Sequence, residues 1–176
     1  MKLTVLGLSG ALMHDASAAL YVDGRLVAAA EEERFTRDKH AKNRMPFNAA
    51  KFCMEFGGVE PGDIDVVAFP FAKVSLLSPA RWHFAKRYWY APERSVDALL
   101  NGNRHFRRNV KRVRGLLDAL GIDWNKIEFD SVEHHIAHAS SAYHLSGFQE
   151  KTAILGIDGK GEYASTFFGY GENGEI

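Results

Sequence analysis

Two stretches of this chain of 176 residues, one near each end, share a pattern that constrains its architecture more than any other feature. Residues 3–10 and 152–159 both run through apolar residues into a glycine, and Leu6 aligns with Leu155. In each copy an Ala-Ser pair follows, and then a second β-like run that ends in a glycine-containing turn. An internal repeat reports architecture more reliably than a single motif. The sequence therefore predicts two related lobes that each open with strand, turn and strand.

Short apolar runs and turn signals predict the elements between the two copies. Asp23-Gly24 separates two β-like runs, which is a strong signal for a hairpin. Pro46 begins a helix that Gly57-Gly58 closes. The predicted strands cover residues 3–9, 18–22, 26–30, 64–69 and 126–132, and a histidine-rich helix follows the last of them. This order predicts a mixed α/β layer rather than a simple alternating parallel sheet.

Residues 72–114 form an aromatic and basic segment in which we expect Pro79 and Pro92 to break any long helix. Between positions 81 and 114 there are ten Lys and Arg residues but only two acidic residues, although the whole chain has 22 of each charge. One interpretation is a solvated amphipathic insert, and the other is a surface on which RNA bases stack. We favour the solvated insert.

The composition excludes some classes of protein. No stretch approaches the roughly 20 apolar residues of a membrane span, and the single cysteine, Cys53, excludes an internal disulfide framework. We expect a cytoplasmic protein with no membrane partner.

A histidine-rich stretch at residues 133–143 contains the strongest candidate for chemistry. His134 and His138 are four residues apart, so a helix places both imidazoles on one face. Asp158 follows the apolar run 152–157 and would bring a carboxylate from a strand end. Two imidazoles and a carboxylate suit Zn, Fe or Mn. From spacing alone, metal binding and an accidental pairing stay equally open. Because position 135 is His, the zinc-protease motif H-E-x-x-H is excluded.

The turns at residues 10–17 and 158–162 occupy equivalent places in the two copies. We expect them to form a phosphate clamp, in which Gly159 and Gly161 let backbone N–H groups approach phosphate oxygens. Read alone, the two glycines are typical of a tight hairpin.

Four blocks resemble the carbamoyltransferases that modify antibiotics and nodulation factors. They match the amino-terminal part of that family's actin-like domain, over about residues 1–45 and 125–176, whereas residues 72–114 depart from it. The blocks are His14-Asp15-Ala16-Ser17 before Asp23-Gly24, Glu31-Glu32-Glu33-Arg34-Phe35, Glu133-His134-His135-x-x-His138, and Asp158-Gly159-x-Gly161-Glu162.

The resemblance implies an actin-like, duplicated ATPase-type fold. Residues 1–150 would form the first lobe, with the basic aromatic insert, and residues 151–176 would open the second. It also implies a divalent metal, Fe or Zn, or else Mn, on His134, His138 and Asp158.

The resemblance further implies a function and roles for residues of the first lobe. Such enzymes make carbamoyl adenylate from ATP and carbamoyl phosphate in a separate YrdC-like domain, and then transfer the carbamoyl group to a hydroxyl of a small molecule or glycan. His14 and Lys39 would be catalytic, and Asp15 and Ser17 would belong to the first phosphate turn.

Two alternatives stay open, namely a tRNA threonylcarbamoyl transferase-like enzyme and a catalytically inert partial domain. The Glu31-Glu32-Glu33-Arg34-Phe35 block and the histidine block fit the small-molecule branch better, so we do not expect nucleic acid as a partner. The YrdC-like domain and most of the second lobe are absent from these residues. We therefore expect no turnover by this chain alone, and an unpaired sheet edge at residues 152–176 that favours self-association.

Overall fold

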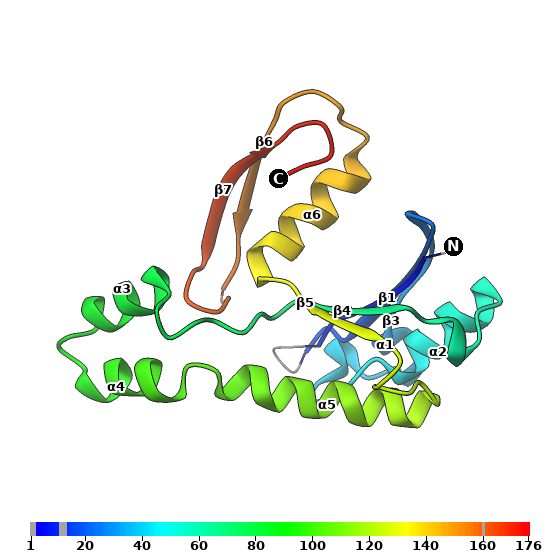
Figure 1. Cartoon of the computed structure of the whole chain (residues 1–176), viewed down its shortest axis with the longest axis horizontal. Helices are drawn as coiled ribbons and strands as arrows, with labels where there is room; N and C mark the ends of the chain where they lie inside the picture. The colour runs from blue at the N-terminus through cyan, green and yellow to red at the C-terminus, as the bar shows by residue number, and fades with distance from the viewer. Residues whose placement is uncertain (1–2, 11–13, 160) are drawn as a thin grey trace. The chain divides into compact units, whose positions relative to one another are not determined.

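The computed structural model describes residues 3–10, 14–159 and 161–176, which form a five-stranded mixed sheet and a separate two-stranded sheet (Figure 1). The chain divides into two compact units. The first unit is Met1–Pro70 with Arg107–Ser131, and the second unit is Phe71–Phe106 with Val132–Ile176. The predicted mixed α/β class is confirmed. No helix among the described residues is both long and apolar enough to cross a bilayer.

The five-stranded sheet of the first unit has the strand order β3-β2-β1-β4-β5. Strand β1 pairs antiparallel with β2 and parallel with β4, and β4 pairs parallel with β5. Asp23 and Gly24 turn the chain between β2 and β3 with positive φ values of 50° and 75°, as the hairpin signal predicts. The strands are β1 (Thr4–Leu8), β2 (Ser17–Val22), β3 (Arg25–Glu31), β4 (Val66–Phe69) and β5 (Glu128–Ser131).

Helices cover this sheet and complete its core. Helix α2 (Phe47–Gly57) packs against β2 and β3. The end of α5 (Arg104–Leu120) lies beside α2, and both helices lie below the strands in Figure 1. The core includes Leu6, Leu20, Val67, Phe69 and Leu117, all of them no more than 1% exposed. The shorter helices of this unit are α1 (Glu32–Thr36), η1 (Lys39–Ala41) and η2 (Pro61–Asp63).

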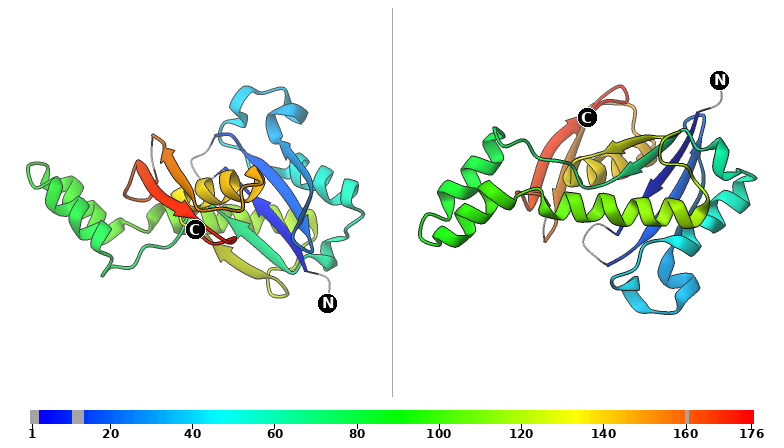
Figure 2. Two further views of the ribbon diagram at one scale, coloured as in Figure 1. Left: turned by 90° about the horizontal axis from the view of Figure 1, so that it is seen from above. Right: turned by 60° about the horizontal axis from the view of Figure 1, so that its bottom comes forward.

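The second unit combines a helix with a hairpin and carries two further helices. Helix α6 (His134–Ser146) packs against β6 (Thr152–Ile157) and β7 (Thr166–Gly171), which pair antiparallel. Helices α3 (Pro79–Arg87) and α4 (Pro92–Asn101) pack together as a helical pair, which Figure 2 shows from two sides. Among the described residues, no other strand pairs with β6 or β7.

Pro79 and Pro92 interrupt any long helix, as predicted, but each of them also begins a short helix. Each proline stands at the first position of a helix, where its missing N–H costs nothing and its fixed φ suits the helix. The buried Arg81 guanidinium then donates hydrogen bonds to the carbonyls of Ala98 and Leu99 at the end of α4. The middle segment is therefore an ordered pair of helices, joined by a buried cation.

The two hairpins that the repeat predicts have equivalent register. Leu6 of β1 faces Leu20 of β2, and Leu155 of β6 faces Phe168 of β7. The predicted lobe boundary between residues 150 and 151 stays a prediction, since the compact units group α6 with the second hairpin.

Candidate metal centre

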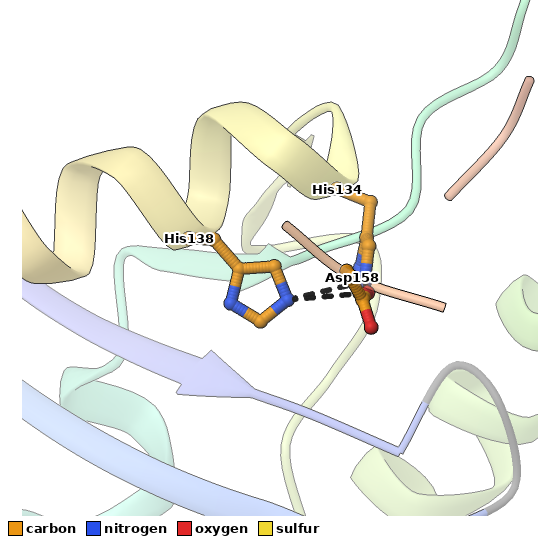
Figure 3. Close-up of side chains that lie close together, drawn as sticks. All are labelled: His134, His138 and Asp158. Atoms are coloured by element: carbon orange, nitrogen blue, oxygen red, sulfur yellow. Dashed lines mark hydrogen bonds and ion pairs between the residues drawn. The ribbon is translucent and has the colours of Figure 1, made fainter. Parts of the chain in front are cut away.

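Helix α6 carries two imidazoles on one face. Small residues such as Ala137 and Ala139 favour the helix, and Gly147 ends it in the left-handed conformation, with φ of 78°. The Nε2 atoms of His134 and His138 lie 3.2 Å apart, as the spacing of four residues predicts. Figure 3 shows both rings projecting from the same side of the helix.

Asp158 adds a carboxylate from the end of β6. Its Oδ2 lies 2.7 Å from Nε2 of His134 and 3.6 Å from Nε2 of His138 (Figure 3). These side chains form a group whose ligand atoms all lie within 4.8 Å of one another. The sequence thus predicted three side chains that the fold brings together, although they come from two different elements.

The spacing of the three ligand atoms fits one metal ion. Ligand atoms about 2.1 Å from an ion, at tetrahedral angles, lie roughly 3.4 Å apart, and the observed separations of 2.7, 3.2 and 3.6 Å bracket that value. Two imidazole nitrogens and one carboxylate oxygen also suit Zn or Fe. Three protein ligands would leave at least one position open for a substrate or water.

The surroundings of Asp158 keep it in the anionic form that a metal ligand requires. The hydrogen bond from His134 is the largest cause that lowers the pKa of its carboxyl, and the Gly159 N–H and the charges of His134 and His138 act in the same direction. Burial opposes them, and the net pKa lies below the usual value of 3.8. The carboxylate is therefore ionised at neutral pH.

His135 lies outside this group and has a different environment. It is buried, and neither of its ring nitrogens has a hydrogen-bond partner among the described residues. Its ring packs against Gly161, where a Cβ atom would approach the ring carbon Cε1 to 2.5 Å. Glycine at position 161 is therefore required by packing, whereas Gly159 has no neighbour within 4 Å of such an atom. Phosphate binding by these two glycines stays a prediction.

The first unit contains the other predicted site residues. Asp15 accepts hydrogen bonds from Nδ1 of His14 at 2.7 Å and from Nδ1 of His40 at 2.8 Å, one on each oxygen. These bonds, that of His40 most of all, lower the pKa of the Asp15 carboxyl. Lys39 is exposed at the start of η1, and Ser17 begins β2. Residues 11–13 of the predicted phosphate turn lie outside the described residues.

Sequence reasoning missed two residues with long-range contacts. His40 follows Lys39 directly, but its partner Asp15 is 25 residues away. Glu162 belongs to a quoted block but was assigned no role, and its carboxylate contacts the backbone at His134, which is 28 residues away. The signal that could have indicated a role for Glu162 was an acidic residue only four positions after Asp158. For His40, the signal was a run of charged residues after β3.

Comparison with known proteins identifies related sequences over almost the whole chain. The family model described as "Carbamoyltransferase N-terminus" matches residues 4–176. The nodulation protein NolNO of Sinorhizobium fredii is 34% identical over 97% of this chain, and an uncharacterized protein of Synechocystis sp. is 33% identical over 98%. The chain spans 23% and 28% of those two proteins, or about a quarter of their length.

The family match also runs through the middle segment, so the expectation that residues 72–114 depart from the family was wrong. Among solved structures, YeaZ from Pseudomonas aeruginosa aligns with 98% of this chain and 62% of its own, at 18% identity and a TM-score of 0.46.

Proposed function

Because the chain belongs to the carbamoyltransferase family, we propose that it is the amino-terminal part of an enzyme that transfers a carbamoyl group from carbamoyl adenylate to a hydroxyl. The acceptor is a small molecule or a glycan, and carbamoyl phosphate and ATP supply the adenylate. The observation that carries the metal-assisted form of this proposal is the convergence of His134, His138 and Asp158 within 4.8 Å.

The three ligands would hold a divalent metal, Fe, Zn or Mn, with positions left open. When bound, such an ion supplies Lewis-acid polarisation of an oxygen on the transferred group. The protein's own part is to hold the two imidazoles and one anionic carboxylate in place. His134 and His138 are fixed by the helix, and Asp158 is fixed by the end of β6.

His14 and Lys39 would act on the carbamoyl group itself. Asp15 accepts from Nδ1 of His14, and this orients the ring so that Nε2 points away from the carboxylate. Histidine exchanges protons near neutral pH, so Nε2 is suited to take the proton of the attacking hydroxyl. The exposed ammonium of Lys39 is suited to bind an anionic oxygen of the donor.

An actin-like duplicated fold is part of the same proposal. The mixed sheet of the first unit opens with an antiparallel pair, β1 and β2, and the second unit contains a hairpin of equivalent register, β6 and β7. This equivalence supports two related lobes. The remainder of the second lobe and the YrdC-like domain would then lie outside residues 1–176.

The alternative of a tRNA-modifying enzyme rests on the basic helices, and several of their cations have structural partners. Arg81 binds the carbonyls at the end of α4, and Arg112 donates to the carbonyls of Gly10 and Arg44. The Arg114 guanidinium lies over the Trp124 ring. These contacts favour a structural use of the positive charge, and a salt-dependent RNA-binding assay separates the two functions.

Elemental analysis tests the metal part of the proposal. The chain should purify with, or take up, one divalent metal ion, and His134→Ala and His138→Ala should each abolish stoichiometric binding. His144→Ala is the matched control, because it removes an exposed histidine from the last turn of the same helix. Equal metal content in all three variants would refute the ligand assignment.

A transfer assay tests the reaction. The full-length protein should transfer labelled carbamoyl from carbamoyl phosphate to an acceptor hydroxyl in the presence of ATP, and the 176-residue chain alone should not. In the full-length protein, Lys39→Met should lower transfer strongly while the melting temperature stays nearly constant, since an exposed lysine contributes little to stability. Absence of transfer by the full-length protein would refute the proposed function.

A further inference from the structure

The N-terminus of helix α6 carries a metal ligand but lacks a cap of its own. The first residue of the helix is His134, and the preceding residue, Glu133, makes no capping hydrogen bond. The first turn contains no acidic residue. The first N–H groups of a helix have no partner within it, and negative charge near them is favourable. The helix that presents the two imidazoles therefore needs a partner from elsewhere in the chain.

Glu162 supplies that partner. Its two carboxylate oxygens each lie 3.2 Å from the backbone N of His134, and Oε1 also accepts a hydrogen bond from the N–H of Ala72 at 2.7 Å. One half-buried carboxylate thus joins the N-terminus of α6 to the segment that leads into α3. Charge-assisted hydrogen bonds of this kind are stronger than neutral ones.

The residues beside Glu162 anchor the same loop. Gly161 packs against the buried His135 ring, and its N–H donates to the carbonyl of Ala164. The Tyr163 ring lies against Phe84, at a centroid distance of 5.5 Å. Three consecutive residues are therefore docked on neighbouring elements of the second unit. Asp158 lies four residues before Glu162, and its own N–H donates a hydrogen bond to the carbonyl of Ser165.

We propose that Glu162 is a positioning residue of the metal centre, which rests on the metal site of the proposed function. It is not part of the group of ligand atoms, and its oxygens are engaged by backbone N–H groups. It fixes the backbone of His134 and the loop that follows Asp158. The His134 imidazole and the Asp158 carboxylate lie 2.7 Å apart in this arrangement.

Outer residues that orient metal ligands typically account for 10- to 100-fold in metal affinity. Glu162→Ala removes both acceptors, so we expect a loss of about 10- to 100-fold. Glu162→Gln keeps one acceptor oxygen at the same reach and should recover much of the affinity. Glu162→Asp keeps the charge but is one methylene shorter, so it should bind more weakly than the Gln variant.

Titration of the metal-free 176-residue chain with Co²⁺ tests this inference by a readout other than activity. The dissociation constant and the visible absorption of bound cobalt report affinity and ligand geometry, and thermal unfolding of the metal-free form reports stability. Glu133→Ala is the matched control, because it removes a carboxylate at the same helix end that makes no capping bond. Its affinity should stay within about threefold of the parent, well below the 10- to 100-fold loss expected for Glu162→Ala.

The outcomes separate the inference from the proposed function. Weak binding by Glu162→Ala, with an altered cobalt spectrum and partial recovery in Glu162→Gln, supports the positioning role. Tight binding by the parent and equal affinity in all Glu162 variants overturns it and leaves the metal site intact. No cobalt binding by the parent overturns both. If Glu162→Ala does not fold, the Gln and Asp variants decide the question. Cobalt affinity equal to that of the parent in both of them overturns the inference.

Discussion

Each unit of the molecule holds two imidazoles against one aspartate, and the two clusters differ in how the aspartate is used. In the first unit Asp15 gives one oxygen to His14 and the other to His40, through the Nδ1 atom of each ring. In the second unit, Oδ2 of Asp158 faces the Nε2 atoms of both His134 and His138.

Asp15 binds one ring with each of its oxygens, so it orients both imidazoles. At Asp158 two ring nitrogens converge on one carboxylate oxygen, an arrangement in which all three atoms can bind one ion. The residue types are the same in both clusters, and only their geometry differs. Asp15 therefore acts as a clamp that sets the ring orientation of His14. Asp158 has the arrangement of a metal ligand.

The two units also stabilise their clusters by different means. Leu6 and Leu20 of the first hairpin are fully buried, but Leu155 and Phe168, at the equivalent positions of the second, are 69% and 83% exposed. The first unit thus rests on an apolar core. In the second unit the hydrogen bonds of Glu162 and the contact between Gly161 and His135 hold the site together.

The largest expected effect separates the two aspartates. Asp158→Asn should abolish stoichiometric metal, because an amide is a much poorer ligand than an anionic carboxylate. Asp15→Asn should leave the metal content unchanged. Elemental analysis of both variants checks this difference, and metal loss in Asp15→Asn alone would reverse the roles that we assign to the two clusters.

A smaller effect concerns the packing that supports the second cluster. Gly161→Ala should destabilise the chain by about 1–3 kcal/mol, because the new methyl group collides with the buried His135 ring. Gly159→Ala is the control, because no atom lies within 4 Å of its added methyl group. Urea unfolding of the metal-free chain measures both. A similar small loss in the two variants would show that the loop yields easily and that packing at Gly161 is dispensable.

The smallest effect concerns the protonation of Asp15. Because hydrogen bonds lower its pKa in the folded state, its contribution to stability is present above the unfolded value of about 3.8 and is lost as pH falls through the lower folded value. A carboxyl NMR titration should show this pKa rising toward 3.8 in His40→Ala, and rising less in His14→Ala. His144→Ala should leave the titration unchanged. A larger rise in His14→Ala would mean that His14 is the dominant partner.

Local patterns in the sequence predicted the parts of the fold that depend on neighbouring residues. The Asp23-Gly24 hairpin, the helix after Pro46 and the spacing of His134 and His138 all express a short-range period or turn preference. The helices that begin at Pro79 and Pro92 were missed because the prolines were interpreted only as helix breakers, whereas each stands at the start of a helix.

Contacts between distant residues could not be read from such patterns. Nothing near Glu162 indicates that its carboxylate meets the N–H groups of His134 and Ala72. Likewise, nothing near His40 indicates a bond to Asp15. Such pairings arise only when the tertiary fold brings separate elements together.

The bonds of Glu162 also bear on the order in which the second unit folds. His134 and Asp158 meet across only 24 residues, whereas the bond from Ala72 to Glu162 spans 90. Closing the longer loop costs about 1 kcal/mol more in chain entropy. Contacts between near residues generally form early, so we expect the imidazoles and the carboxylate to gather before the segment at Ala72 docks. The bond between Ala72 and Glu162 would then slow the reopening of a site that has already formed.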